Sequence, residues 1–313
     1  MATFLNNVRT APQPGGRPPA AVELTPDGVL AGVRPSAAAK RGASASDLPV
    51  YAFAALPPGA IVPGIDEPNL RAPELVAEAI SATLEQVSPR TRAVTLVLPD
   101  TVVRVFVLDF DSLPTKAEEA IPVIRFRLRK MVPFDVEHAG VSYQVLSQGR
   151  AEWKVLIAVV PGPILAEYEA VVRTAGYEPG AVMSSSLAAL EMAGPMEAML
   201  AANVSGSGIT TLIANGQDLL LYRTLDLPAG DAERIAEIQR DIAVAAAYYE
   251  DKLGAPPHRL YYAGNRDIRE FAAWLAAPGL EIVELVPRPE SGLLTSLGHE
   301  SIAAIAGALA GAS

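Results

Sequence analysis

Thr115-Lys-Ala-Glu-Glu-Ala-Ile-Pro-Val-Ile-Arg-Phe-Arg-Leu-Arg-Lys-Met-Val-Pro-Phe134 is the segment from which the architecture of this chain is best understood. Its apolar residues recur at intervals of four and three, which predicts a helix with one apolar stripe. The stripe consists of Ala117, Ile121, Ile124, Leu128 and Met131. Thr115 and Glu118 have the spacing of a capping box that starts the helix, and Pro133 ends it. Pro122 lies inside this segment, so the helix is either kinked there or begins there.

Apolar runs flank this helix at residues 102–110 and 141–146, and they predict two strands on which the stripe lies. The result is a strand–helix–strand unit set between other strands. Arg125, Arg127 and Arg129 lie on or near the helix face that the stripe does not use. They indicate either an ordinary solvated face or a local binding surface.

The composition limits the function classes. The chain has 313 residues, half of them hydrophobic, so it can build a large core in two domains or in one domain with an insertion. A net charge of −10 argues against a nucleic-acid partner, because such surfaces neutralise phosphates. The absence of cysteine excludes disulfides, thiolate metal sites and cysteine nucleophiles, and it fits a reducing cytoplasm.

No segment predicts direct insertion into a membrane. The longest uncharged apolar stretches, residues 155–166 and 301–312, are shorter than the ~20 residues that a membrane helix needs. The first residues lack the basic and then apolar order of a secretion signal. Any membrane association is therefore expected to come through a partner.

The pattern of the rest of the chain predicts two similar halves, each of which begins with a hairpin and continues through helices and strands. The second hairpin turns at Asn215-Gly216, the strongest short hairpin signal. We expect a duplicated α/β fold with an inserted small α/β subdomain. The expected parts are a flexible tail at 1–20, a first lobe at 21–99 with 177–200 and 296–313, the insert at 100–176, and a second lobe at 201–295.

Several segments in this order resemble the PilM family of type IV pilus assembly proteins, which belongs to the actin-like, FtsA-related ATPase superfamily. They are Leu56-Pro-Pro-Gly-Ala-Ile-Val-Pro-Gly64, Val97-Leu-Pro-Asp100, Met131-Val-Pro-Phe-Asp-Val-Glu137, Val141-Ser-Tyr-Gln-Val-Leu146, Leu156-Ile-Ala-Val-Val160, Ala175-Gly-Tyr-Glu-Pro179 and Ala304-Ile-Ala-Gly-Ala308. The resemblance spans about residues 21 to 311. It implies an actin-like duplicated fold with ribonuclease H-like halves, located in the cytoplasm at the periphery of the inner membrane.

The resemblance also implies ATP and Mg²⁺ in the cleft between the lobes, held by three loops. The corresponding residues here are Thr25, Asp27, Gly28, Ser205, Gly206, Ser207, Thr210, Gly264 and Asn265. All three loops depart from the family pattern: Glu23 precedes the first turn, Asn203 replaces an aspartate, and Asn265 follows Gly264. Because losing a carboxylate weakens a Mg²⁺ shell, we expect nucleotide binding to be weak or absent and the chain not to be an enzyme.

Other catalytic and metal sites find little support. No Gly-Lys pair is present, which excludes a P-loop, and His138, His258 and His299 lie in separate segments without ligand spacing. We assign no catalytic or metal-binding residues. Ser184-Ser-Ser186 is expected to cap the helix that follows it.

The insert is then the candidate functional part. In the PilM family it frames a groove for the cytoplasmic N-terminal peptide of PilN, a single-span membrane protein, beside other pilus platform proteins. The predicted partner-binding residues are Val103, Val105, Arg125, Arg129 and Phe134, of which Phe134 fits a place in the core equally well. Two alternatives remain: a GspL-like component of a type II secretion system, and an active ATPase or sugar kinase of the same superfamily.

Overall fold

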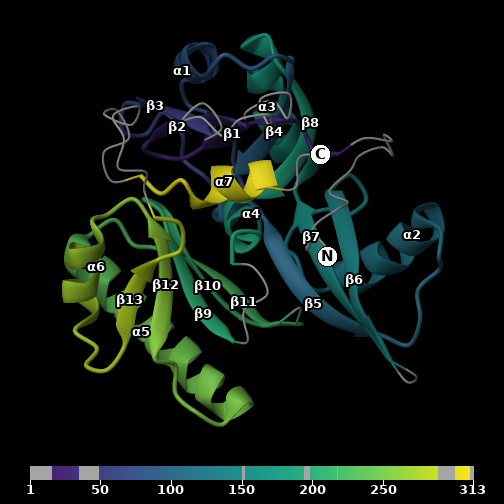
Figure 1. The fold of residues 1–313 in the computed structure, drawn as a ribbon. Helices are drawn as coiled ribbons and strands as arrows, with labels where there is room; N and C mark the ends of the chain where they lie inside the picture. The colour runs from purple at the N-terminus through teal and green to yellow at the C-terminus, as the bar shows by residue number, and fades with distance from the viewer. Residues whose placement is uncertain are drawn as a thin grey trace, which may run out of the picture.

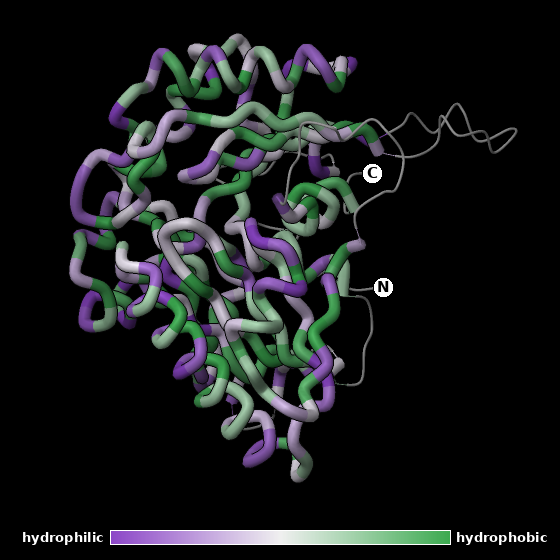
Figure 2. The backbone as a smooth tube through the Cα atoms, turned by 90° about the vertical axis from the view of Figure 1, so that its left-hand side faces the viewer, coloured by the Kyte–Doolittle hydropathy of each residue, from purple (hydrophilic) through white to green (hydrophobic). Residues whose placement is uncertain are grey.

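A computed structural model describes residues 16–34, 49–149, 152–193, 198–216, 218–287 and 300–310 of the chain. Three sheets organise these residues: two of five strands and one of three. Figure 1 shows the first five-stranded sheet at the top, the second at the lower left, and the three-stranded sheet at the right. Hydrophilic and hydrophobic residues alternate along the outer helices (Figure 2), as expected of helices that cover sheets.

The first sheet has the strand order β3-β2-β1-β4-β8. Strands β1 and β2 form the expected hairpin, β3 adds to it antiparallel, and β4 and β8 continue it in parallel. The bounds are β1 (Ala20–Leu24), β2 (Gly28–Val33), β3 (Val50–Ala55), β4 (Ala93–Leu98) and β8 (Glu178–Ser184).

Helices cover both faces of this sheet, so β1 is buried throughout. On one face, Val22 and Leu24 share a core with α1 (Pro73–Val87) and α3 (Gly162–Thr174). On the other, Ala21 shares a core with α4 (Ser185–Leu190) and α7 (Ala303–Ala310). Alternation along the strand therefore places Glu23 on the side of α4 and α7, toward the second lobe.

The contact between α4 and α7 depends on small residues. A Cβ added to Gly307 would lie 1.8 Å from the carbonyl oxygen of Ala188. The two helices pack this closely because position 307 has no side chain. The same core takes in residues of the second sheet, including Met199 and Leu212, which joins the two lobes.

The second sheet repeats the first. Its order β11-β10-β9-β12-β13 again has an antiparallel hairpin joined to parallel strands. The expected hairpin turn is confirmed, with Gly216 at φ +61°. The bounds are β9 (Met199–Val204), β10 (Gly208–Asn215), β11 (Asp218–Asp226), β12 (Arg259–Gly264) and β13 (Glu281–Glu284), with α5 (Asp231–Leu253) and α6 (Ile268–Leu275) packed on them.

The three-stranded sheet has the order β5-β7-β6 and follows the short 3₁₀ helix η3 (Asp100–Val102). Its strands are β5 (Arg104–Phe110), β6 (Gly140–Gln148) and β7 (Trp153–Val160). One face carries α2 (Ala117–Leu128), which is the expected strand–helix–strand unit. The opposite face meets the lobes, where Val105 and Val107 pack against their core.

Helix α2 differs from its predicted details. The predicted capping box of Thr115 and Glu118 is wrong, because Lys116 occupies the N-cap and no side chain caps the helix. Pro122 lies within the helix at an exposed position, where water can solvate the carbonyl group that loses its N–H donor. The buried stripe is Ala120, Ile124 and Leu128, whereas Ala117 and Met131 are exposed.

Three of the predicted domain boundaries also differ from those in the structure. Helix α3, expected within the insert at 100–176, packs instead in the first-lobe core. The boundary expected after residue 200 falls inside β9, a strand of the second sheet that the sequence reading missed. The tail was expected at residues 1–20, of which residues 16–20 are described. Ala20 already begins β1, and Arg17 lies 3.6 Å from Glu191 in a buried ion pair, so both belong to the folded part. Residues 1–15 lie outside the described part of the chain.

Within the described ranges, no helix combines the length and apolar character needed to cross a bilayer.

Candidate functional site

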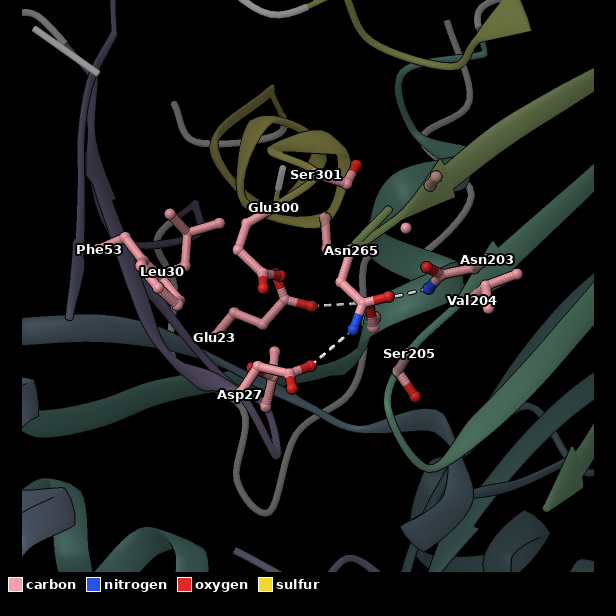
Figure 3. A pocket seen from close by; sticks show the side chains of 15 residues that line it. Glu23, Asp27, Leu30, Phe53, Asn203, Val204, Ser205, Asn265, Glu300 and Ser301 are labelled. Atoms are coloured by element: carbon pink, nitrogen blue, oxygen red, sulfur yellow. Dashed lines mark hydrogen bonds between the residues drawn. The ribbon is translucent and has the colours of Figure 1, made fainter. Parts of the chain in front are cut away.

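The three predicted nucleotide loops meet between the lobes (Figure 3). The turn after β1 and the turn after β9 occupy equivalent places in the two hairpins, and Asp27 approaches Gly206 across the gap. Asn265, which follows β12, donates a 2.7 Å hydrogen bond to Asp27 Oδ2. The loops therefore bond one another across the cleft.

Below these loops lies a hydrogen-bonded network that the sequence did not predict. Ser185 donates to Glu23 Oε1 at 2.7 Å, and the Asn203 amide lies 2.9 Å from Ser185 Oγ and 3.2 Å from Asp100 Oδ2. Tyr222 donates to Asp100 Oδ1 at 3.1 Å. Five elements, η3, β1, α4, β9 and β11, thus contribute polar side chains to one site.

The serines at the start of α4 have a different role from the predicted one. The N-cap, Ser184, makes no side-chain capping bond. Ser186 instead directs its hydroxyl and its backbone N–H to Asp100, with the N–H 2.9 Å from Oδ1. The cluster of serines was a visible signal, but the acceptor lies 86 positions away in the sequence.

Burial controls the electrostatics of this network. Desolvation raises the pKa of Glu23 from 4.5 to about 8, opposed by the Ser185 hydrogen bond and reinforced by Glu300 and Asp100. Desolvation also raises the pKa of Asp100, although its hydrogen bonds with Ser186 work against the shift. Glu23 is therefore neutral at pH 7, so it offers a metal ion no charge.

The residues in this cleft do not fit ATP and Mg²⁺. The two cavities between the lobes measure about 40 Å³ and 20 Å³, whereas small-molecule sites occupy roughly 300–1,000 Å³. The side-chain amide of Asn203 donates its N–H groups to hydrogen bonds with Asp100, Ser185 and Ser186. The Asn203 amide is thus already paired within the protein and is not free to bind a ligand.

The nine predicted nucleotide residues fall into two groups. Those that line the cleft cavities are Thr25, Asp27, Ser205, Thr210, Gly264 and Asn265. The other three, Gly28, Gly206 and Ser207, shape the turns. A Cβ added to Gly28 would meet Phe53, and a Cβ added to Gly206 would lie 3.2 Å from Asp27. The Ser207 hydroxyl lies 3.3 Å from Ser205 Oγ.

A much larger cleft, of about 630 Å³, lies between the first lobe and the three-stranded sheet. Its walls are the segment before α1, the loop after α2 and the start of α3. Its apolar lining residues are Ile65, Pro68, Phe134, Pro161, Pro163 and Ile164, and its acidic ones are Asp66, Glu67, Asp135 and Glu167. The only basic side chain in the lining is His138, which lies 2.6 Å from Asp135.

Two charged residues fix the walls of this larger cleft. Arg125 of α2 donates to the carbonyl groups of Val136 at 2.8 Å and Ala139 at 3.0 Å, and so holds the loop after α2. Glu167 of α3 accepts from the backbone N–H groups of Asn69 and Leu70, both at 2.8 Å, and holds the opposite wall. Bonds to charged groups are among the stronger ones, so both walls are preorganised.

The five predicted partner-binding residues do not form one surface. Phe134 lines the cleft, and Arg125 supports it from behind. Arg129 lies on the exposed side of the same loop, with Nε 3.2 Å from Glu137 Oε1. Val103 is only 3% exposed, and Val105 lies on the face of β5 opposite α2. Neither of those two residues lines the larger cleft.

The chain resembles a solved PilM–PilN type IV pilus biogenesis complex with a TM-score of 0.72, at 19% identity, covering 94% of this chain and 98% of that one. It shares the fold of the matched chain of that complex. The predicted fold class, a duplicated α/β fold with an inserted small α/β subdomain, is therefore confirmed. The chain also resembles the cytoplasmic domain of EpsL, an inner membrane component of the type II secretion system of Vibrio cholerae, with a TM-score of 0.48, 15% identity, and coverage of 89% and 92%. No protein-family model and no curated protein sequence matches it.

Proposed function

We propose that this chain is a non-catalytic, PilM-like scaffold of a type IV pilus assembly platform, located at the cytoplasmic face of the inner membrane. Its partner is a PilN-type single-span membrane protein, whose cytoplasmic N-terminal peptide lies in the cleft beside α3. The observation that carries the proposal is this preorganised 630 Å³ cleft on a PilM fold.

The lining of the cleft supports a peptide as its occupant. Apolar side chains from three segments provide pockets for anchor residues, and extended peptides bind through such pockets. The acidic residues around them favour a peptide that carries a free amine, lysine or arginine. Asp66 and Glu67 are exposed at one wall and Asp135 at the other, so cations could be met from both sides.

The interlobe cleft supports the non-catalytic part of the proposal. Asn203 in place of an aspartate, a neutral Glu23 and the bond from Asn265 to Asp27 leave neither the charge nor the space that ATP·Mg²⁺ requires. We expect no heat of binding when ATP·Mg²⁺ is titrated into the protein. Tight binding with turnover would instead support the active ATPase or sugar kinase.

A peptide titration tests the scaffold function. The probe is a fluorescently labelled peptide with the sequence of the N-terminal cytoplasmic segment of a PilN-type single-span protein. Ile65→Glu places a carboxylate in the apolar wall and is expected to weaken binding by roughly tenfold or more, as loss of an interface anchor does. The matched control is Val62→Glu, which adds the same charge at a 48% exposed position of the same segment, outside the lining. Equal affinity of both variants would remove the cleft as the binding site.

A further inference from the structure

Helix α2 has an apolar outer face that nothing in the described structure covers. Phe126 is 73% exposed, Val123 40% and Met131 39%. These are three of the seven large hydrophobic side chains that are exposed in the described ranges, and they fall within nine consecutive residues. Ile124 and Leu128 already anchor the helix from beneath, so the outer residues are not needed to hold it in place.

Free positive charges accompany these apolar residues. Arg127 and Lys130 are exposed, and neither makes an ion pair or a hydrogen bond within the described part of the chain. The acidic residues of α2, Glu118 and Glu119, are confined to its first turn. The C-terminal half of α2, together with the turn at residues 129–131 that follows it, is therefore apolar and cationic, in a chain whose net charge is −10.

We propose that this half of α2 contacts an anionic membrane surface, with Phe126 at the level of the lipid headgroups and Arg127 and Lys130 paired with lipid phosphates. A single convex helix face with one exposed aromatic is well suited to a lipid interface, where apolar and basic residues act together. A protein partner would need to cover roughly 800 Å² of this chain, for which α2 offers few apolar residues. Such a contact lies on the membrane surface and requires no spanning segment.

The position of α2 fits this role, and the argument here rests on the proposed function. Arg125 ties α2 to the loop that carries Asp135 and His138, two residues of the peptide cleft. A peptide that continues into a membrane span brings that side of the molecule close to the bilayer.

Fluorescence tests the contact directly, with Phe126→Trp as a conservative reporter in the full chain. The probes are vesicles of phosphatidylglycerol and phosphatidylcholine, vesicles of phosphatidylcholine alone, and both compositions with brominated acyl chains. We expect a blue shift and quenching by bromine on the anionic vesicles only, beyond what the parent chain shows. Absence of quenching on anionic vesicles, or equal quenching on neutral ones, would overturn the proposal.

A charge variant tests the role of the cations. R127Q/K130Q in the same reporter background is expected to lower the partition coefficient on anionic vesicles by roughly 30-fold, since each basic residue contributes about fivefold. R90Q/R269Q removes the same charge from exposed positions of the two lobes and is the control. Equal losses in both variants would show general charge attraction and overturn the α2 contact. Because the vesicles carry no peptide, failure here leaves the peptide titration unaffected.

Discussion

Replacing Glu23 with glutamine should stabilise the protein and remove much of its pH dependence. The Glu23 side chain is 6% exposed, and its pKa rises from 4.5 to about 8 on folding. Between these two values the folded state holds a proton that the unfolded state has released, so stability falls as the pH rises from 4.5 to about 8. At pH 7 this amounts to at most about 3 kcal/mol of lost stability.

Glutamine is neutral at every pH, and its side-chain oxygen can accept the hydrogen bond from Ser185 Oγ. In the parent protein this hydroxyl lies 2.7 Å from Glu23 Oε1. Glu23→Gln is therefore expected to raise the free energy of unfolding by up to about 3 kcal/mol at pH 7 and to have little effect near pH 4.5. Urea denaturation across this range measures the difference between variant and parent. Glu78→Gln, on the exposed side of α1, is the matched control. A difference that does not grow with pH would refute the assignment of a neutral, buried Glu23.

Three further predictions concern single side chains. Arg125→Ala removes the donor that holds the carbonyl groups of the loop after α2. Denaturation should therefore show an unfolding free energy lower by about 1.5–3 kcal/mol. A peptide titration should show a lower affinity, because the loop forms one wall of the cleft. Unchanged affinity would mean that the loop is not part of the site. Asn203→Asp points a carboxylate at Asp100 and should lower thermal stability without restoring ATP binding; a calorimetric ATP signal would contradict this. Asp66→Asn should weaken binding of a cationic peptide about twofold to fivefold at low salt and have no effect at high salt, whereas an effect independent of salt would argue against charge recognition.

Local rules predicted the elements of this fold well. The turn at Asn215-Gly216, the apolar run of β5 and the spacing of Ile124 and Leu128 in α2 depend on neighbouring residues, so the sequence displays them directly. Strand β9 was missed because its residues, Met-Leu-Ala-Ala-Asn-Val, suit a helix equally well, and only its pairing with β10 and β12 makes it a strand.

The candidate site was less accessible, because its contacts join distant positions. Tyr222 and Asp100 are 122 residues apart, and no local pattern announces their hydrogen bond. Arg125 looked like a free ligand for a peptide because its acceptors, the carbonyl groups of the following loop, have no sequence signature. Val103, predicted to bind the partner, is buried in the first-lobe core, which its apolar side chain alone does not reveal.

Helix α3 gives the larger cleft an unusual mechanical property. It supplies one wall through Ile164 and Glu167, while Tyr168, the next residue, is completely buried in the first-lobe core. The end of the insert that leads into α3 is consequently anchored to the core of that lobe. Tension applied through a bound tail would therefore be transmitted through α3 into the core of the first sheet.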